Sequence, residues 1–193
     1  MNFFVHLTPD NFGAECLGRV AALDPHLGAG AQEMGVYGWI GPGPAPADQD
    51  FWSDQLPDWT AGVLPHPYSP EVHSSGWDLD RQKLTVDIRE AFLTEPFQSR
   101  FLALFRDLPR DLLGPTHGAV PALLLSASLA DPVSSATVLG YLTGLYELRQ
   151  KGLFPFPAYA VLGIGNASAL ESQEQDLTRA LVAQGVLDLQ EVY

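Results

Sequence analysis

The sequence predicts a three-layer α/β sandwich with a mostly parallel central sheet, formed by one domain over residues 1–193. Three observations support this fold class. Short apolar segments alternate with amphipathic stretches of helical length along most of the chain. The C-terminal third contains successive strand–helix–strand units, which imply parallel pairing with right-handed crossovers. Residues 41–83 interrupt this alternation as an irregular, acidic insertion that is rich in proline and tryptophan.

The chain begins with a predicted strand, helix and second strand. Residues 3–7 form an apolar run that is typical of a buried strand. Asp10 follows and can cap a helix whose apolar positions recur with helical spacing. That helix is expected to end near residues 24–25, because the residue before a proline avoids the helical conformation. Residues 35–40 predict the second strand.

The insertion combines many prolines with several aromatic residues. Residues 42–70 carry seven of the sixteen prolines, which fix φ and remove backbone donors, so we expect an irregular loop. A flexible linker would normally lack the tryptophans found here, and we therefore expect the loop to pack onto the domain. Closing the edge of the core is the simpler role for these aromatic side chains. A binding platform is the alternative.

Two elements are predicted after the insertion. Leu84, Val86 and Ile88 alternate with polar residues, which predicts a half-buried strand over residues 84–89. Thr94 then caps the most clearly amphipathic helix of the chain. The apolar stripe of that helix consists of Phe97, Phe101, Leu104, Phe105 and Leu108.

The best-defined strand–helix unit lies in the C-terminal third. Residues 120–126 are almost continuously apolar, as expected of a strand buried on both faces. Asp131 precedes a proline, and this pair predicts a helix cap followed by the first helical position. The helix should run to about Gln150 and end at Gly152.

Further elements are predicted beyond this unit. Residues 158–164 predict the next strand, and a capping-box pair predicts a helix over residues 168–185. Residues 186–192 predict a last strand at the sheet edge. The fold prediction depends on parallel pairing of the strands at 120–126 and 158–164 in the centre of the sheet.

Composition argues against several function classes. The net charge is −13, from 23 acidic and 10 basic residues, and a field of this sign repels nucleic-acid phosphates. No apolar run reaches the roughly 20 residues of a membrane span, and the N-terminal residues lack the pattern of a secretory signal. The single cysteine, Cys16, allows neither an internal disulfide nor a Cys-based zinc site. We therefore expect a cytoplasmic protein that binds neither membranes nor nucleic acid, and no metal site.

Two loops could bind a phosphate-bearing cofactor. In an open parallel sheet, ligands bind beyond the carboxyl ends of the strands, where the loops at 126–131 and 163–168 are expected. Backbone N–H groups beside a helix start can hold a phosphate there. Helix capping requires the same residue types, however, and neither loop matches a complete nucleotide-binding motif. The candidate cofactor-binding residues are Ser126, Ser128, Ser134, Gly163, Gly165 and Asn166; no catalytic residue is identified.

A third of the chain is similar to an enzyme family. Residues 122–128, with the sequence Ala-Leu-Leu-Leu-Ser-Ala-Ser, and the long helix after them resemble the C-terminal half of flavodoxin-like NAD(P)H-dependent FMN reductases. The resemblance implies an enzyme that binds a flavin or nucleotide phosphate at the 126–135 and 163–168 loops. In that family a Ser/Arg-rich phosphate loop follows the first strand, whereas residues 8–13 here are Thr-Pro-Asp-Asn-Phe-Gly. No flavin-site residue is therefore transferred from the family.

Two histidine triplets give a second enzymatic hypothesis. His6-Leu-Thr8 and His73-Ser-Ser75 match the HxT/S triplets of the 2H phosphoesterases, whose paired histidines act as general acid and base. Serine and threonine are frequent enough in this chain for such triplets to arise by chance. We therefore expect a structural role for both histidines.

Another resemblance points away from catalysis. Residues 17–28, with the sequence Leu-Gly-Arg-Val-Ala-Ala-Leu-Asp-Pro-His-Leu-Gly, are followed by Tyr37-Gly-Trp39. This pattern resembles the N-terminal part of some bacterial polymorphic-toxin immunity proteins and covers less than a quarter of the chain. It implies a small, acidic, cytosolic protein that neutralises a protein partner and has no catalytic motif.

The first functional hypothesis is therefore a domain that binds a basic protein. A −13 surface would accelerate association with such a partner. Aromatic residues of the insertion would anchor the contact and surrounding acids would form its rim. The predicted anchors are Trp52, Trp59 and Tyr68, and the predicted rim is Asp48, Asp50, Asp54 and Asp58.

Overall fold

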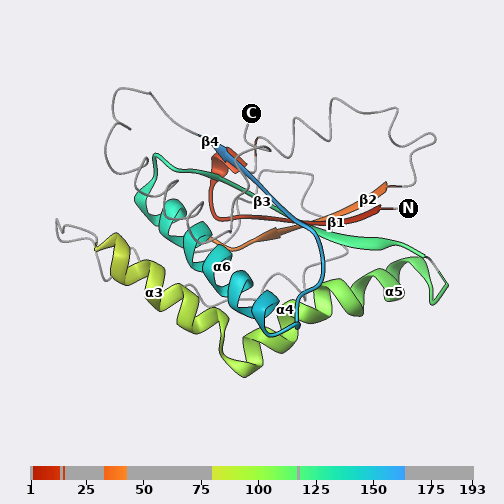
Figure 1. Ribbon diagram of the computed structural model, residues 1–193. Helices are drawn as coiled ribbons and strands as arrows, with labels where there is room; N and C mark the ends of the chain where they lie inside the picture. The colour runs from red at the N-terminus through yellow and green to blue at the C-terminus, as the bar shows by residue number, and fades with distance from the viewer. Residues whose placement is uncertain (1, 14, 16–32, 43–79, 117, 164–193) are drawn as a thin grey trace.

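The computed structural model describes residues 2–13, 15, 33–42, 80–116 and 118–163. Within these residues, four parallel strands form one sheet in the order β2-β1-β3-β4 (Figure 1). The predicted α/β class and parallel sheet are confirmed. The strands are β1 (Asn2–Thr8), β2 (Glu33–Trp39), β3 (Val120–Ser128) and β4 (Ala158–Gly163).

The pairing on which the fold prediction depends is confirmed. β3 and β4 are parallel, with Leu123 opposite Ala158 and Ser128 opposite Gly163. β1 lies between β2 and β3, so β1 and β3 are the central strands of the described sheet. β4 has a single neighbour among the described strands and lies at their edge, not at the centre.

Four helices accompany the sheet in the described part of the chain: α3 (Arg81–Phe92), α4 (Glu95–Arg106), α5 (Leu108–Leu113) and α6 (Pro132–Gln150). The predicted helices after Thr94 and Asp131 are confirmed. The Thr94 side chain does not cap α4, because its hydroxyl donates to the carbonyl oxygen of Ala91, and Leu108 of the predicted stripe begins α5. Asp131 caps α6 by accepting from the backbone N–H of Ser134. Gly152, two residues beyond α6, has a φ of 69°, the left-handed conformation that commonly ends a helix.

The strand predicted over residues 84–89 is wrong, because these residues belong to α3. Asp80 caps this helix through a 2.9 Å hydrogen bond from the backbone N–H of Lys83. The buried side chains are Leu84, Ile88 and Phe92, at the four-residue spacing of one helix face. Val86, which completed the apparent alternation, is 43% exposed.

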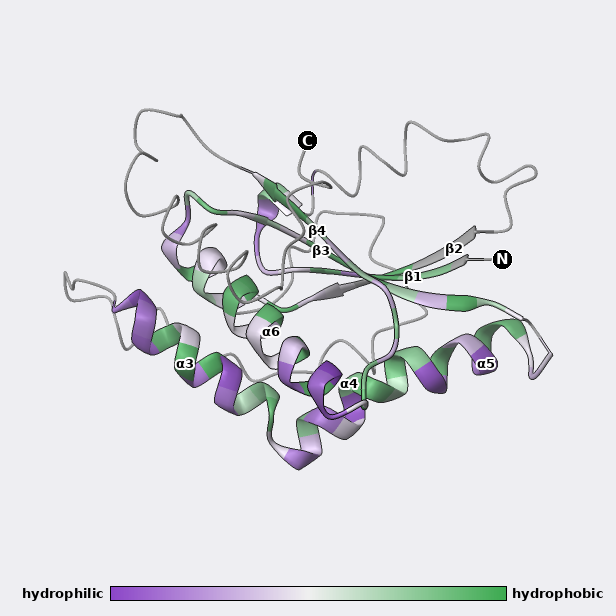
Figure 2. Cartoon of the chain, viewed as in Figure 1, coloured by the Kyte–Doolittle hydropathy of each residue, from purple (hydrophilic) through white to green (hydrophobic). Residues whose placement is uncertain are grey.

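One face of the sheet is continuous with the helical core. Leu7 lies opposite Leu125, which lies opposite Ala160, and all three have apolar neighbours along their strands. α6 packs on this face and is in turn covered by α3, so that most of its side chains are buried. Figure 2 shows mainly apolar colours on β3 and β4, whereas hydrophilic residues recur along α3.

α3 and α6 pack closely because α6 presents glycines to α3. A Cβ atom added at Gly144 would overlap the ring of Phe92, and one added at Gly140 would overlap Ile88. Phe92 in turn lies against the rings of Phe97, Phe101 and Tyr141. This aromatic cluster belongs to the hydrophobic core and lines no part of the candidate site.

The opposite face of the sheet has different neighbours. His6 lies opposite Leu124, which lies opposite Tyr159, and Tyr159 is 47% exposed. The described part of the chain does not include residues 16–24, 43–79 and 164–193. Four predictions are therefore untested in whole or in large part: the first helix, the insertion, the helix at 168–185 and the strand at 186–192. The last three residues of the predicted insertion, 81–83, belong to α3.

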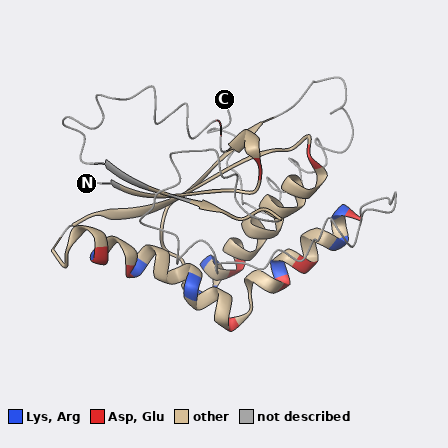
Figure 3. Ribbon diagram, turned by 180° about the vertical axis from the view of Figure 1, so that it is seen from behind, with Lys and Arg blue, Asp and Glu red and all other residues tan. Residues whose placement is uncertain are grey.

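Charged side chains of the described residues occur mainly on the helices. Figure 3 shows them spaced along α3, α4 and α5, with both signs interspersed. Arg110 of α5 forms exposed ion pairs with Asp107 and Asp111, and such pairs contribute little to stability; Arg89 of α3 forms a partly buried pair with Glu147 of α6 at 3.6 Å. Among the described helices, none combines the length and the apolar character that a membrane crossing requires.

Candidate functional site: the carboxyl ends of β1, β2 and β3

The loops that leave β1, β2 and β3 meet at one edge of the sheet. The chain passes from β1 to β2 on one side of β1 and later returns to β3 on its other side. The carboxyl ends of β1 and β3 therefore flank a topological switch point, which is where open α/β sheets bind ligands. The chemistry of this edge is set by the residues that immediately follow each strand.

Asp10 ties the end of β1 to the end of β3. One oxygen of its carboxylate accepts from the backbone N–H of Gly13 at 2.8 Å, within the helical turn that starts at Asn11. The other oxygen accepts from the backbone N–H of Ser128 at 2.7 Å. Both are charge-assisted hydrogen bonds, which are stronger than neutral ones. Two backbone donors that could hold a phosphate here, those of Gly13 and Ser128, are thus already bound to a carboxylate of the chain itself.

Close packing brings the turn after β1 onto β3. A Cβ atom at Gly13 would overlap the side chain of Thr8 and the backbone oxygen of Ser126, so only glycine fits. The hydroxyl of Ser126 is buried and donates to the carbonyl oxygen of Gly13 at 3.5 Å. Thr8 also holds the turn, because its hydroxyl donates to the carbonyl oxygen of Asp10 at 3.0 Å.

Asp131 performs the corresponding role at the start of α6. Its Oδ2 accepts from the backbone N–H of Ser134 at 2.8 Å and from the hydroxyl of Ser134 at 2.5 Å. The side chain is otherwise exposed to solvent. Among the described residues, no hydrogen bond to its Oδ1 is found, so this oxygen can accept from a ligand.

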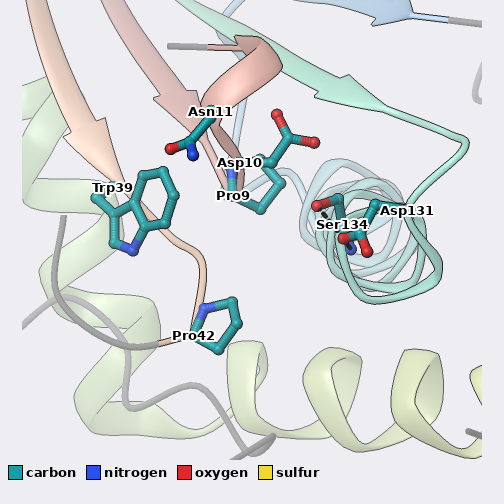
Figure 4. Close-up of a pocket in the computed structure, with 7 residues that line it drawn as sticks. All are labelled: Pro9, Asp10, Asn11, Trp39, Pro42, Asp131 and Ser134. Atoms are coloured by element: carbon teal, nitrogen blue, oxygen red, sulfur yellow. Dashed lines mark hydrogen bonds between the residues drawn. The ribbon is translucent and has the colours of Figure 1, made fainter. Parts of the chain in front are cut away.

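A hollow of about 440 Å³ lies between these two turns and the end of β2. Figure 4 shows the indole of Trp39 on one side and Asp131 with Ser134 on the other, with Pro42 below. The upper wall in this view comes from the turn after β1. The described residues that line it are Pro9, Asp10, Asn11, Trp39, Pro42, Asp131 and Ser134.

The charge of this hollow is negative. Among the residues that the structure describes, its lining contains two carboxylates and no lysine or arginine. The N-terminus of α6 opposes them with the equivalent of about +0.5 charge. The helical turn at Asn11 contributes at most a similar amount, so the sum remains roughly −1. The hollow therefore favours a cation over an anion.

His6 and Thr8, the residues of the first histidine triplet, are both buried. Desolvation by burial lowers the pKa of His6 to about 4, so the imidazole is neutral at pH 7. The ring packs at 5.7 Å from the ring of Phe4. His73, of the second triplet, lies outside the described residues. His6, the described histidine of the two triplets, therefore has the environment of a core histidine.

The structure describes four of the six predicted cofactor-binding residues. Ser126 is buried between strand and turn, and Ser128 uses its hydroxyl to accept from the N–H of Ala130 at 3.2 Å. Ser134 alone among them lines the hollow. Gly163 ends β4, where its carbonyl oxygen accepts from Leu129 and the ring of Phe12 would overlap an added Cβ. The two that fall outside the described residues are Gly165 and Asn166.

The predicted partner-binding residues all lie outside the described part of the chain: Trp52, Trp59, Tyr68, Asp48, Asp50, Asp54 and Asp58.

Sequence reasoning identified Asp10 and Asp131 only as helix caps, and it gave Trp39 no role in a site. The position of these residues relative to the predicted strands could have identified them as site residues. Asp10 and Trp39 stand at the ends of the two predicted N-terminal strands, which is where a parallel sheet gathers its ligands.

Comparison with known proteins provides no match: no family model fits the sequence, and no curated protein or solved structure is significantly similar to the chain. The described residues also contain no group of three or more His, Cys, Asp or Glu side chains that could hold a metal ion. The geometry and charge of the hollow are therefore the observations on which a functional proposal rests.

Proposed function

We propose that this chain is a small, acidic, cytoplasmic domain that binds a basic protein partner and neutralises it in the manner of an immunity protein. The observation that carries the proposal is the negative lining of the hollow at the switch point. Asp10 and Asp131 lie at the place where an α/β domain receives its ligand, and the lining residues that the structure describes include no basic side chain. The net charge of −13 adds long-range attraction for the same class of partner and repulsion for nucleic acid.

The insertion provides the larger contact in this proposal. Trp52, Trp59 and Tyr68 would serve as aromatic anchors, and the acids at 48, 50, 54 and 58 would form the rim that accelerates association. The loop after β2 enters the insertion directly, since Pro42, which lines the hollow, immediately precedes residues 43–79. The hollow and the insertion are therefore continuous along the chain.

The finer architecture belongs to the same proposal. The face of the sheet that carries His6, Leu124 and Tyr159 is opposite the face covered by α6. We infer that the predicted helices at 10–24 and 168–185 cover it and complete a three-layer sandwich. Removal of residues 168–193 would then lower the free energy of unfolding and raise binding of a hydrophobic dye.

A flavodoxin-like enzyme that binds a flavin or nucleotide phosphate is the second candidate. It is favoured by the strand order β2-β1-β3-β4 and by a hollow between β1 and β3, the position of the flavin in flavodoxin-like sheets. Asp10 argues against it, because its carboxylate already binds the N–H groups of Gly13 and Ser128. A phosphate placed there would also meet the charge of Asp131.

Thermal unfolding in the presence of candidate ligands separates the two functions. The purified protein is mixed with a ten-residue peptide containing five arginines, or with FMN, NADPH or ATP, at low salt. We expect the peptide to raise Tm and the other three to leave it unchanged, because only a cation complements the hollow. A Tm increase with FMN or a nucleotide and none with the peptide would overturn the proposal.

The same thermal unfolding assay tests the proposed aromatic anchors of the insertion. Replacing Trp52 and Trp59 by alanine should reduce the effect of a natural basic partner more than that of the short peptide, because the peptide is too small to cover the insertion. Equal affinity of the partner for the wild type and for this double variant would remove the insertion from the interface.

A further inference from the structure

We infer that the hollow receives a single arginine side chain of the partner, with the guanidinium lying between Trp39 and Asp131. This inference rests on the proposed function and identifies the group that the negative hollow selects. It requires a flat aromatic wall, a carboxylate that can still accept, and space for one long side chain. The described residues provide each of these.

The aromatic wall is the indole of Trp39 at the end of β2. Figure 4 shows it at the side of the hollow opposite α6, with Asn11 between it and Asp10. A planar guanidinium stacks on an indole face, and tryptophan is the best aromatic partner for a cation. Pro9 and Pro42 add apolar surface around it, along which the methylene groups of an arginine can pack.

The carboxylate is that of Asp131. Its Oδ2 is used in capping α6, whereas its Oδ1 has no hydrogen bond among the described residues. Because Ser134 holds the carboxylate in one orientation, the acceptor is fixed before a ligand arrives, which reduces the entropy lost on binding. Asp10 adds negative charge, and each of its oxygens already accepts from a backbone N–H group.

Space and net charge suit one monovalent side chain. The hollow measures about 440 Å³, within the usual range for ligand sites and larger than one arginine requires. Its summed charge of roughly −1, after the helix N-termini are counted, matches a single cation. Arginine is favoured over lysine because the walls offer a stacking face and a fixed acceptor, whereas an ammonium is a compact point charge.

Fluorine NMR on protein labelled with 5-fluorotryptophan tests the inference directly. The chain contains four tryptophans, and the resonance lost in Trp39→Phe identifies Trp39. The probe is N-acetyl-arginine amide, with the neutral isostere N-acetyl-citrulline amide as control. We expect arginine to shift the Trp39 resonance saturably and citrulline to leave it in place.

Two variants sharpen the result. Asp131→Asn keeps a good helix cap and should weaken arginine binding at least fivefold, since it removes the charged acceptor. Glu90→Gln removes the same charge from an exposed position on α3 and should leave the affinity within a factor of two. The inference would be overturned if citrulline shifted the Trp39 resonance as much as arginine does. It would also be overturned if lysine amide bound with equal affinity, or if arginine did not shift the Trp39 resonance. If the Trp39 resonance does not shift while the basic peptide still raises Tm, only the proposed arginine site is wrong. If the peptide also leaves Tm unchanged, the proposed function is wrong too.

Discussion

Asp10 connects two strand ends at the candidate site. Its two carboxylate oxygens accept from Gly13 and from Ser128, two residues that belong to different strand ends. It therefore fixes the geometry of the switch point and gives it negative charge at the same time. From the sequence, a helix cap could be predicted, because Asp10 precedes an apolar periodic stretch. The bond to Ser128 could not, because it depends on the parallel pairing of β1 with β3.

Asp10→Ala should destabilise the domain by about 2–3 kcal/mol, because it leaves two backbone N–H groups without their charged acceptor. Urea denaturation measures the loss. The control is Asp111→Ala on α5, whose carboxylate forms an exposed ion pair with Arg110 at 3.7 Å. This change should cost less than about 0.5 kcal/mol. Equal small losses for both variants would show that Asp10 does not hold the two strand ends together.

His6 predicts a specific dependence of stability on pH. Burial lowers its pKa to about 4, below the 6.5 of an unfolded histidine. Between these values the unfolded chain binds a proton that the folded chain does not, so stability falls as the pH drops from 6.5 to 4. The contribution is about 3 kcal/mol over the whole interval, at about 1.4 kcal/mol per pH unit.

The measurement compares urea denaturation of the wild type and His6→Gln at several pH values between 7 and 4. The difference in unfolding free energy between the two proteins should change by about 3 kcal/mol across this range. All other groups titrate in both proteins, so the comparison isolates His6. A difference that stays constant with pH would mean that His6 titrates normally in the folded state.

Tyr141 is buried completely, and within the described part of the structure its hydroxyl has no hydrogen-bond partner. Burial raises its pKa well above 10, so the group stays neutral. Tyr141→Phe should therefore raise the free energy of unfolding by about 1 kcal/mol, because a desolvated and unsatisfied hydroxyl is removed while the ring contacts with Phe92 remain.

Thermal and urea unfolding provide the measurement for Tyr141→Phe. Tyr146→Phe is the matched control, since Tyr146 lies on the same helix with 37% of its surface exposed and should be neutral. A loss of stability in Tyr141→Phe would show that the hydroxyl has a partner.

At the scale of elements, the close contact between α3 and α6 shows what periodicity could and could not predict. The sequence identified α6 with its two ends, because a cap, a proline and a terminal glycine all agreed. It misassigned α3, since Leu84, Val86 and Ile88 satisfy a strand pattern over five residues. The helix face continues to Phe92, where it packs against Gly144, and that contact lies far away in the sequence. Short patterns are ambiguous until the next turn of the helix is included.

Gly144→Ala should destabilise the domain by about 2 kcal/mol, although alanine favours helix formation by roughly 1 kcal/mol over glycine. The added methyl group would overlap the ring of Phe92 and force α3 away from α6. Introducing Phe92→Leu together with Gly144→Ala should cost less than the sum of the two single changes, because the smaller side chain accepts the methyl group. Additive losses would contradict direct packing at this point. Gln150→Ala, exposed on the same helix, serves as the neutral control.

At the scale of the whole molecule, the strand pairing predicted from the sequence is confirmed, but it did not predict which residues gather at the carboxyl edge of the sheet. The strands at 120–126 and 158–164 pair as expected, which fixes where their carboxyl ends lie. The serines and glycines were chosen because phosphate-binding loops contain them. Of these predicted residues that the structure describes, only Ser134 lines the hollow, together with two aspartates, two prolines, Asn11 and Trp39. These residues come from three loops distant in sequence, so no local motif could reveal them. Their charge agrees in sign with that of the entire chain.

The most direct test of a cation-selective switch point is calorimetric titration of the arginine peptide into the wild type, Asp131→Asn and Glu90→Gln. Each variant loses one negative charge, so the long-range field of the molecule changes equally in both. The account predicts that Asp131→Asn weakens binding about tenfold while Glu90→Gln stays within about twofold. Equal weakening by the two variants would contradict it, because binding would then depend on total charge and not on the hollow.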